Sequence, residues 1–311
     1  MDYTTLGRTG LRVSVMGLGC GGPSRLGQRY GNSETDSVEI VRAALAQGIT
    51  FFDTAEAYDT EEILGRGLRG ERRENVVIST KMSSWNGDAP APRVRAALEG
   101  SLRRLGTDYV DVYHIHGLAS SRYGHAVAEL VPEMLKLRDE GKLRFVGVTE
   151  AFSPDPGHEM LQQAVQDDCW DIIMVGFNIL NQSARERVLA TTRKKDTGVL
   201  IMFAVRRALR DPANLREALA QLSERGLVEP DVVSDGGGLD FLIHDGGATS
   251  LQDAAYRFCR YEPGVHVVLS GTGDPLHLES NAASLGRPPL PEADTARLRE
   301  MFARVDDISG S

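Results

Sequence analysis

The sequence predicts an α/β protein that folds as an eight-stranded parallel β/α (TIM) barrel. Short apolar runs rich in β-branched and aromatic residues recur eight times, and segments with helical periodicity separate them. The runs are apolar throughout rather than alternating, which is typical of strands buried on both faces of a parallel sheet. Eight such units favour a closed barrel, because an open doubly wound sheet usually has fewer strands.

Each repeat contributes one strand and one helix. We expect strands at residues 13–19, 50–53, 76–79, 109–115, 144–148, 171–177, 199–204 and 265–269. Helical periodicity is clearest at residues 37–47, 61–68, 94–105, 126–140 and 184–192. Glycines at positions 17, 19, 21 and 22 keep an open dinucleotide-binding sheet as the weaker alternative.

Three segments do not belong to the repeat. Residues 3–14 contain a Gly-Arg-Thr-Gly turn and predict a hairpin that closes the bottom of the barrel. Residues 212–225 and 292–305 predict two extra helices. We expect residues 1–311 to form a single domain that includes all three segments. The glycine-rich stretch 235–247 is either a lid or a solvated loop.

Composition limits the class of partner. The formal net charge of -9 and pI near 5.4 argue against nucleic acid or an anionic membrane. Cys20, Cys169 and Cys259 are odd in number and lack zinc or redox spacing, which indicates a reducing compartment. No leader or membrane-spanning run is visible, so we expect a cytoplasmic protein, and the sequence is silent on its oligomeric state.

Polar residues end three consecutive predicted strands. Asp53 ends the second strand, Lys81 the third and His116 the fourth, and barrel enzymes carry their sites at these ends. Tyr58 follows Asp53 by five positions, so its loop can return the hydroxyl to the same rim. His114 and His116 both point to the same face of the fourth strand and compete for one role. We prefer His116 because it is nearer the barrel mouth.

This set of residues permits a proton relay. A tyrosine with a pKa of about 10 is a poor acid or base at neutral pH, and a nearby lysine ammonium is expected to lower that pKa. A carboxylate then holds the lysine in place. Taken singly, Asp53 reads as a helix cap, Tyr58 as a loop anchor and Lys81 as a surface charge. At three adjacent strand ends, a joint role is the better interpretation.

The segments 49–58, 78–81 and 111–116 resemble the three signature segments of the aldo-keto reductases, and the likeness extends along nearly the whole chain. The resemblance implies an aldo-keto reductase-like barrel domain in which Tyr58 is the general acid for carbonyl reduction. It further implies that Asp53 and Lys81 tune Tyr58, and that His116 orients the substrate carbonyl. The same resemblance implies a nicotinamide cofactor at the barrel mouth, which supplies the hydride chemistry.

The residues expected to hold the cofactor depart from the family pattern. Thr149 and Glu150 stand where the family has a Ser-Asn pair, and an ionised glutamate can only accept hydrogen bonds. Met174 replaces a glutamine, and Ala204 stands where an aromatic ring often stacks on the nicotinamide. Arg206 and Arg207 follow; they are candidate partners for an extra phosphate, and the alternative is that they contact solvent or the pyrophosphate.

The loop after the eighth strand bears on cofactor choice. We assign cofactor binding there to Ser270, Gly271, Thr272, Gly273, His277 and Asn281. Gly271 and His277 replace a lysine and an arginine that commonly bind the extra phosphate of NADP, and Asp274 repels it. We therefore expect NAD(H) or dual use rather than strict NADP(H).

Two further functions stay open beside an oxidoreductase acting on small aldehydes, ketones or sugar-like alcohols. One is a cofactor-binding regulatory or sensor subunit. The other is a sugar-phosphate lyase or isomerase in which Lys81 forms a Schiff base with the substrate. Tyr30 and Trp85 are expected as walls of the substrate pocket. The histidines are dispersed and predict no metal site.

Overall fold

The computed structural model describes residues 1–84, 87–230, 232 and 238–310, and its strands close into a parallel barrel in the order β10-β3-β4-β5-β6-β7-β8-β9. The predicted β/α barrel is confirmed. The barrel strands are β3 (Met16–Gly19), β4 (Phe51–Asp53), β5 (Val77–Ser83), β6 (Val110–Leu118), β7 (Leu143–Glu150), β8 (Ile172–Gly176), β9 (Gly198–Met202) and β10 (Val267–Ser270).

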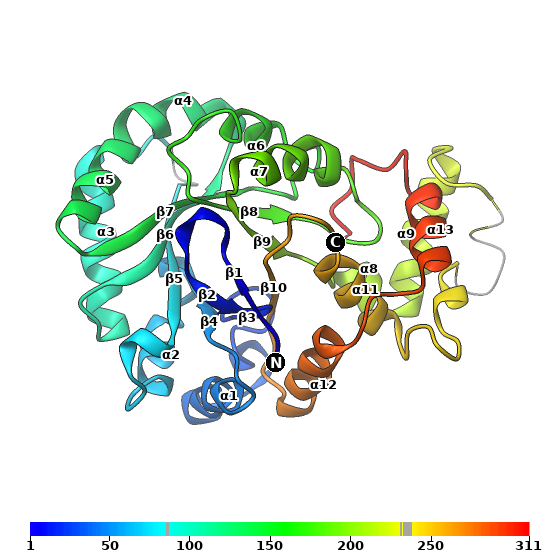
Figure 1. Ribbon diagram of the computed structural model, residues 1–311, viewed down its shortest axis with the longest axis horizontal. Helices are drawn as coiled ribbons and strands as arrows, with labels where there is room; N and C mark the ends of the chain where they lie inside the picture. The colour runs from blue at the N-terminus through cyan, green and yellow to red at the C-terminus, as the bar shows by residue number, and fades with distance from the viewer. Residues whose placement is uncertain (85–86, 231, 233–237, 311) are drawn as a thin grey trace.

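Helices surround the strands in an outer ring, which Figure 1 shows from the end that carries the N-terminal hairpin. The α-helices are α1 (Glu34–Ala46), α2 (Glu61–Gly67), α3 (Ala91–Leu105), α4 (Tyr123–His125), α5 (Val131–Asp139), α6 (Glu159–Ala164), α7 (Ala190–Lys195), α8 (Arg207–Arg210), α9 (Pro212–Glu224), α11 (Leu251–Arg260), α12 (Pro275–Gly286) and α13 (Glu292–Met301). The extra helices predicted near residues 212–225 and 292–305 are α9 and α13.

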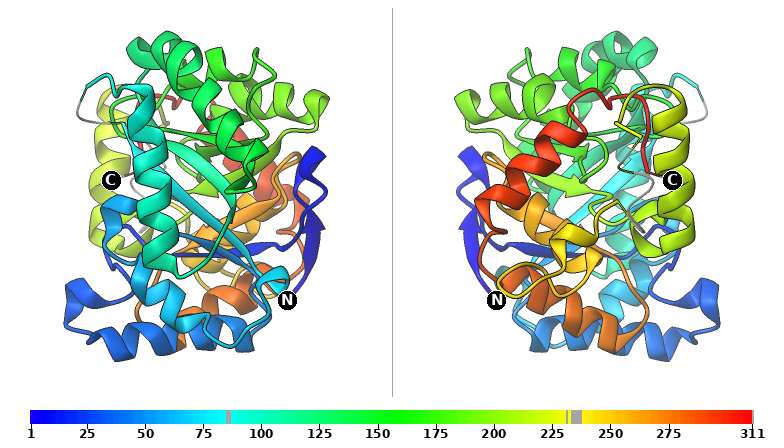
Figure 2. Two further views of the ribbon diagram at one scale, coloured as in Figure 1. Left: turned by 90° about the vertical axis from the view of Figure 1, so that its left-hand side faces the viewer. Right: turned by 90° about the vertical axis from the view of Figure 1, so that its right-hand side faces the viewer.

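The hairpin closes the N-terminal end of the barrel, as predicted. Strands β1 (Tyr3–Thr5) and β2 (Arg12–Ser14) pair antiparallel, and the side chains of Leu6 and Leu11 join the cluster that fills the barrel interior. The Arg8 guanidinium also donates to the carbonyl of Trp170 at 2.9 Å. In Figure 2 the hairpin lies at one end of the barrel, and α9 and the C-terminus lie toward the other.

One predicted strand is divided in the structure, and one predicted helix is less regular than expected. The first strand was expected over residues 13–19, but β2 ends at Ser14 and β3 begins at Met16. The Ser14 hydroxyl donates to the Met16 carbonyl at 2.6 Å and accepts from the Thr50 amide at 2.9 Å, so it takes over the backbone bonding where the chain turns into the barrel. The segment 126–140 is helical, as predicted, but it begins with a π-helical turn before α5, whose first turn contains a proline that lacks an amide donor.

The glycine-rich stretch 235–247 lies partly outside the described residues. Within its described portion, Asp240–Leu242 form a single 3₁₀ turn and Ile243 makes one bridge with Ala248. Among the helices of the described ranges, none is long and apolar enough to cross a membrane.

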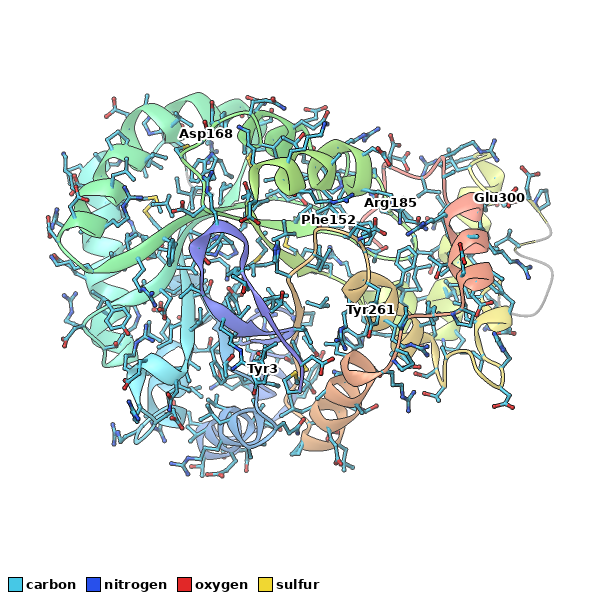
Figure 3. All side chains as sticks on the ribbon, viewed as in Figure 1. Tyr3, Phe152, Asp168, Arg185, Tyr261 and Glu300 are labelled. Atoms are coloured by element: carbon cyan, nitrogen blue, oxygen red, sulfur yellow. The ribbon has the colours of Figure 1, made fainter. Side chains whose placement is uncertain are left out.

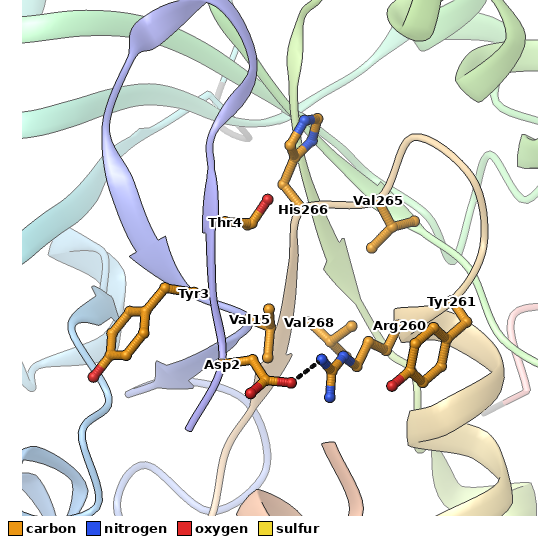
Figure 4. Close-up of a pocket in the computed structure, with 9 residues that line it drawn as sticks. All are labelled: Asp2, Tyr3, Thr4, Val15, Arg260, Tyr261, Val265, His266 and Val268. Carbon is orange, nitrogen blue, oxygen red and sulfur yellow. Dashed lines mark hydrogen bonds and ion pairs between the residues drawn. The ribbon is translucent and has the colours of Figure 1, made fainter. Parts of the chain in front are cut away.

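A cleft of about 470 Å³ opens between the hairpin and the end of α11 (Figure 4). The Arg260–Asp2 ion pair lies on one side of it, and His266 lies at its upper end. Val15 and Val268 form its floor at the N-terminal ends of β3 and β10. This cleft is therefore at the end of the barrel opposite the predicted catalytic residues.

Candidate active site

Lys81 and Asp53 form a buried ion pair at the C-terminal ends of β5 and β4. The Lys81 ammonium lies 2.6 Å from Asp53 Oδ2 and also donates to the Thr54 carbonyl at 2.7 Å. The Ser79 hydroxyl donates to Asp53 Oδ1 at 2.8 Å. Parallel pairing puts Asp53 beside Ser79 on the neighbouring strand, which explains why residues 28 positions apart meet.

Tyr58 and His116 complete the group. Tyr58 ends the 3₁₀ turn Glu56–Tyr58, and this turn brings its hydroxyl to 3.1 Å from His116 Nε2. The two rings meet edge to face, with centroids 5.3 Å apart. The Lys81 ammonium lies 5.3 Å from the centre of the tyrosine ring. The structure thus brings together the four residues that the sequence singled out.

The electrostatics of Tyr58 differ from the sequence-based expectation. Lysine was expected to lower the pKa of the tyrosine, but burial and the Asp53 carboxylate raise that pKa above its usual value. The Asp53 pKa is itself raised by burial, although Lys81 opposes the rise. The Lys81 ammonium donates its hydrogen bonds to Asp53 and to the Thr54 carbonyl, and it lies over the ring of Tyr58 rather than at the hydroxyl. In this state Tyr58 holds its proton.

The structure distinguishes His114 from His116. His114 is fully buried, and its ring lies against Gly147, where an added β-carbon would come within 2.3 Å of Nδ1. His116 lies two positions further along β6, is 8% exposed and contacts the Tyr58 hydroxyl. Burial, followed by the positive charge of Lys81, lowers the pKa of both histidines well below the usual value. The imidazole that reaches Tyr58 is therefore neutral.

Thr149 and Glu150, expected at the carboxamide of the cofactor, have different surroundings. The Thr149 hydroxyl accepts the Gly117 amide at 2.7 Å, which leaves its proton for a second bond. Glu150 is buried: its carboxylate lies 2.9 Å from His158 Nδ1 and accepts the Gly176 amide at 2.7 Å. Burial raises the Glu150 pKa. The structure does not bring Glu150 to the Tyr58 group.

The aromatic residue after β9 is Phe203, one position before the expected Ala204. Ala204 is 1% exposed, whereas Phe203 is partly exposed and has a φ of +67°, a backbone conformation that phenylalanine rarely adopts. Its ring stacks on Phe152, which lies beside the strands in Figure 3, and the Arg206 guanidinium lies 4.0 Å from its centre. Met174, at the family's glutamine position, is buried in the barrel interior.

The predicted cofactor loop after β10 is built around Ser270. The Ser270 hydroxyl contacts the Tyr256 hydroxyl and the Asn281 amide, each at 2.9 Å. Thr272 accepts the Asp274 amide, and Asp274 caps α12. His277 is 74% exposed, and its nearest ionic partner is Asp274 at 3.7 Å.

The loop after β3 covers the cofactor loop, a contact that the sequence did not reveal. The Asn32 amide donates to the Gly273 carbonyl at 2.7 Å, and a β-carbon on Gly273 would lie 2.1 Å from Gly27 Cα. Gly271 approaches Gly19 in the same way, with 2.9 Å from a built β-carbon to the Gly19 carbonyl oxygen. The glycines therefore allow the loops after β3 and β10 to pack backbone against backbone at the barrel mouth.

The structure does not establish the two residues predicted to line the substrate pocket, Tyr30 and Trp85. Tyr30 lies in the loop after β3 and is 64% exposed, and Trp85 lies outside the described residues. In the described ranges no cluster of acidic, histidine or cysteine side chains has the geometry of a metal site. Sequence reasoning missed the contacts of Gly21 with Tyr58 and of Asn32 with Gly273, which join distant segments, and the contact of His158 with Glu150. The glycines at 17–22 were the only signal for the first of these.

Comparison with known proteins defines the class. The family model described as "Aldo/keto reductase family" matches residues 16–303, so the chain belongs to the aldo/keto reductase family. This membership indicates an oxidoreductase, and the family uses nicotinamide cofactors and small carbonyl substrates.

Two curated relatives carry names of this kind. The chain is 29% identical over 300 residues to aldo-keto reductase YhdN of Bacillus subtilis, with 90% of this chain and 87% of that protein covered. It is 39% identical over 157 residues to L-galactose dehydrogenase of Arabidopsis thaliana, a match that spans only 48% of each protein.

Solved structures support the fold. The holo form of aldo-keto reductase AKR11C1 from Bacillus halodurans superposes with a TM-score of 0.72 at 21% identity and covers 97% of this chain and 96% of that one. A thermostable aldo-keto reductase, Tm1743, in complex with epalrestat also gives a TM-score of 0.72, at 24% identity, covering 97% of this chain and 100% of that one. At these identities the likeness concerns the barrel alone.

Proposed function

We propose that the chain is a single catalytic domain that transfers hydride between a nicotinamide cofactor and a small aldehyde, ketone or sugar-like alcohol. The observation that carries this proposal is the contact of the Tyr58 hydroxyl with His116 Nε2 at 3.1 Å, beside the buried Lys81–Asp53 pair. No other grouping of acid, base and lysine in the described residues lies at the ends of adjacent barrel strands.

Tyr58 acts as the general acid in reduction. Its raised pKa keeps the hydroxyl protonated until a developing alkoxide draws the proton, and in oxidation the same oxygen receives it back. According to the tautomer of neutral His116, its Nε2 either donates to the Tyr58 oxygen or accepts the Tyr58 proton, and so orients the hydroxyl toward the substrate oxygen. Lys81 supplies fixed positive charge beside the tyrosine as negative charge develops on its oxygen.

The residues at the mouth fit a nicotinamide cofactor. Gly19 and Gly271 add no side chains to the ends of β3 and β10, and the Thr149 hydroxyl has a proton to donate inside the rim. When bound, the cofactor supplies or accepts the hydride. Ser270, Thr272, Asn281 and the backbone of Gly273 are the groups we assign to its adenosine half.

We propose NAD(H) or dual use rather than strict NADP(H). No lysine or arginine occurs in residues 270–286, and the first turn of α12 carries Asp274 and the exposed His277. Arg29, which is exposed in the loop that covers Gly273, is a competing source of positive charge. A 2'-phosphate therefore lacks a fixed bidentate partner in the loop itself.

Two alternative functions have weaker support. Lys81 Nζ is fully buried and already bonded to the Asp53 carboxylate and the Thr54 carbonyl, so it is poorly placed to attack a substrate and a Schiff-base lyase is disfavoured. A sensor subunit with little turnover has no need of the assembled Tyr58 group. The three cysteines are free thiols, which fits the cytoplasmic location that we propose.

The test is turnover of NADH or NADPH with a panel of small aldehydes, ketones and aldoses, compared between the wild type and Tyr58→Phe. We expect saturable turnover by the wild type and a loss of at least a hundredfold in kcat in the variant, with cofactor affinity retained. Cofactor binding without turnover across the panel would instead support the sensor.

A further inference from the structure

Gly21 lies directly against the ring of Tyr58. A β-carbon at position 21 would lie 2.3 Å from Tyr58 Cε2, 2.4 Å from Cδ2 and 2.6 Å from Cζ. These separations are far below the 3.5 to 4.0 Å of an ordinary carbon contact. Any side chain other than glycine at this position therefore displaces the tyrosine ring or the loop that carries it.

The backbone does not explain the glycine at position 21. The φ angle of Gly21 lies outside the left-handed region, whereas the adjacent Gly22 has a φ of +67°. A β-carbon on Gly22 would meet nothing within 4 Å. The two glycines thus serve different purposes: Gly22 permits the turn, and Gly21 leaves room for the ring.

The other surfaces of the Tyr58 ring face the proton-transfer group. Lys81 Nζ lies 5.3 Å from the ring centre, and His116 meets the ring edge to face. Cys20, next to Gly21, is fully buried, and its amide donates to the Asp53 carbonyl at 2.7 Å. The segment carrying Gly21 is thereby fixed to β4, so it forms a firm surface for the ring.

We propose that Gly21 is a positioning residue for Tyr58, because the missing side chain lets the ring sit where its hydroxyl reaches His116 Nε2. The kinetic consequence of this inference rests on the proposed function, since it requires Tyr58 to transfer a proton. The structural consequence does not. A methyl group at position 21 moves the hydroxyl away from His116 and leaves the barrel and the cofactor loop unchanged.

The first experiment compares Gly21→Ala with Gly124→Ala. Gly124 lies in α4, where a β-carbon would meet nothing within 4 Å, so this variant controls for the glycine-to-alanine change itself. We expect Gly21→Ala to lower kcat by roughly a hundredfold, the order expected for a displacement of about 1 Å at a reacting group. Cofactor affinity, measured by fluorescence titration, stays within about twofold of the wild type in both variants. A kcat within threefold of the wild type overturns the proposal.

The second experiment asks whether the effect passes through the tyrosine hydroxyl. Gly21→Ala is combined with Tyr58→Phe, and the residual kcat is compared in a double-mutant cycle. We expect the alanine to cost less than about threefold in the phenylalanine background, because the group that it displaces is already gone. The same loss in both backgrounds contradicts a positioning role and indicates a general disturbance of the loop.

The third experiment does not depend on turnover. A crystal structure of Gly21→Ala is expected to show the Tyr58 hydroxyl out of hydrogen-bond range of His116, with the Lys81–Asp53 pair intact. An unmoved ring overturns the inference. If the wild type shows no turnover but the ring moves in Gly21→Ala, the proposed function fails and the positioning role stands. If Tyr58→Phe is inactive and Gly21→Ala has the kcat of the wild type, only the inference about Gly21 fails.

Discussion

The Lys81 ammonium lies 2.6 Å from Asp53 Oδ2, with the two side chains 0% and 6% exposed. Neither charge has access to bulk water, so each depends on the other for compensation. This pair lies beneath the ring of Tyr58, and its integrity determines both the stability of the barrel mouth and the electrostatics of the tyrosine.

Removing one member of this pair is expected to destabilise the protein. Lys81→Met leaves a buried carboxylate without its ammonium, and such a loss typically costs about 3 to 5 kcal/mol. The double variant Lys81→Met/Asp53→Asn leaves no buried charge and is expected to recover at least half of that loss. Urea unfolding measures both. A double variant less stable than the single one would refute compensation as the reason for the pair.

Stability is expected to fall with pH below about 6.5, in part because of His114. Its pKa is lowered in the folded state, so the unfolded chain binds the proton first as the pH drops. The resulting contribution is complete above the unfolded pKa and is lost as the pH falls toward the folded one, with a slope of up to about 1.4 kcal/mol per pH unit.

The measurement compares the slope of unfolding free energy between pH 6.5 and 5 in the wild type and His114→Asn. We expect a shallower slope in the variant, whatever its stability at pH 8, because one titrating group has been removed. Lys81 and His116, whose charges also act on His114, are unchanged in the variant. An identical slope in the two proteins shows that the pKa of His114 is the same in the folded and unfolded states, which contradicts the prediction.

His277→Arg is expected to shift cofactor preference toward NADPH. Position 277 lies in the first turn of α12, is highly exposed and has no fixed cation near it in the loop. An arginine there offers a charge-assisted bond to the 2'-phosphate, for which we expect roughly tenfold tighter NADPH binding, or about 1.4 kcal/mol, with NADH unchanged. Gln162→Arg, at an exposed position of α6, adds the same charge elsewhere as a control. A wild type that already prefers NADPH a hundredfold contradicts the proposal.

The two positions of the expected carboxamide clamp are predicted to behave differently. Thr149→Val removes a hydroxyl whose proton remains available and should weaken cofactor binding several-fold. Glu150→Gln should leave cofactor affinity within about threefold, because the Gly176 amide contacts Oε1 and His158 Nδ1 contacts Oε2 of the carboxylate. It should lower stability by about 1 to 3 kcal/mol through the disturbed buried bonds. Calorimetric titration and thermal unfolding measure the two effects, and a large loss of affinity in Glu150→Gln assigns this residue to the cofactor after all.

The sequence by itself determined the barrel and the candidates for its chemistry. Eight apolar runs separated by amphipathic segments can bury their surfaces only as a parallel sheet covered by helices. Parallel connection then requires Asp53, Lys81 and His116 to converge, because neighbouring strands end at the same rim. Local pattern was sufficient here because it repeats along the chain.

The tertiary structure decided what the local pattern does not encode. It set the pKa of Tyr58 upward, because burial and the Asp53 charge act through space. It turned Glu150 toward His158, placed Phe203 rather than Ala204 in the stack with Phe152, and pressed Gly21 against Tyr58. Each of these facts depends on contacts between segments whose separation in the chain says nothing of their distance in the fold.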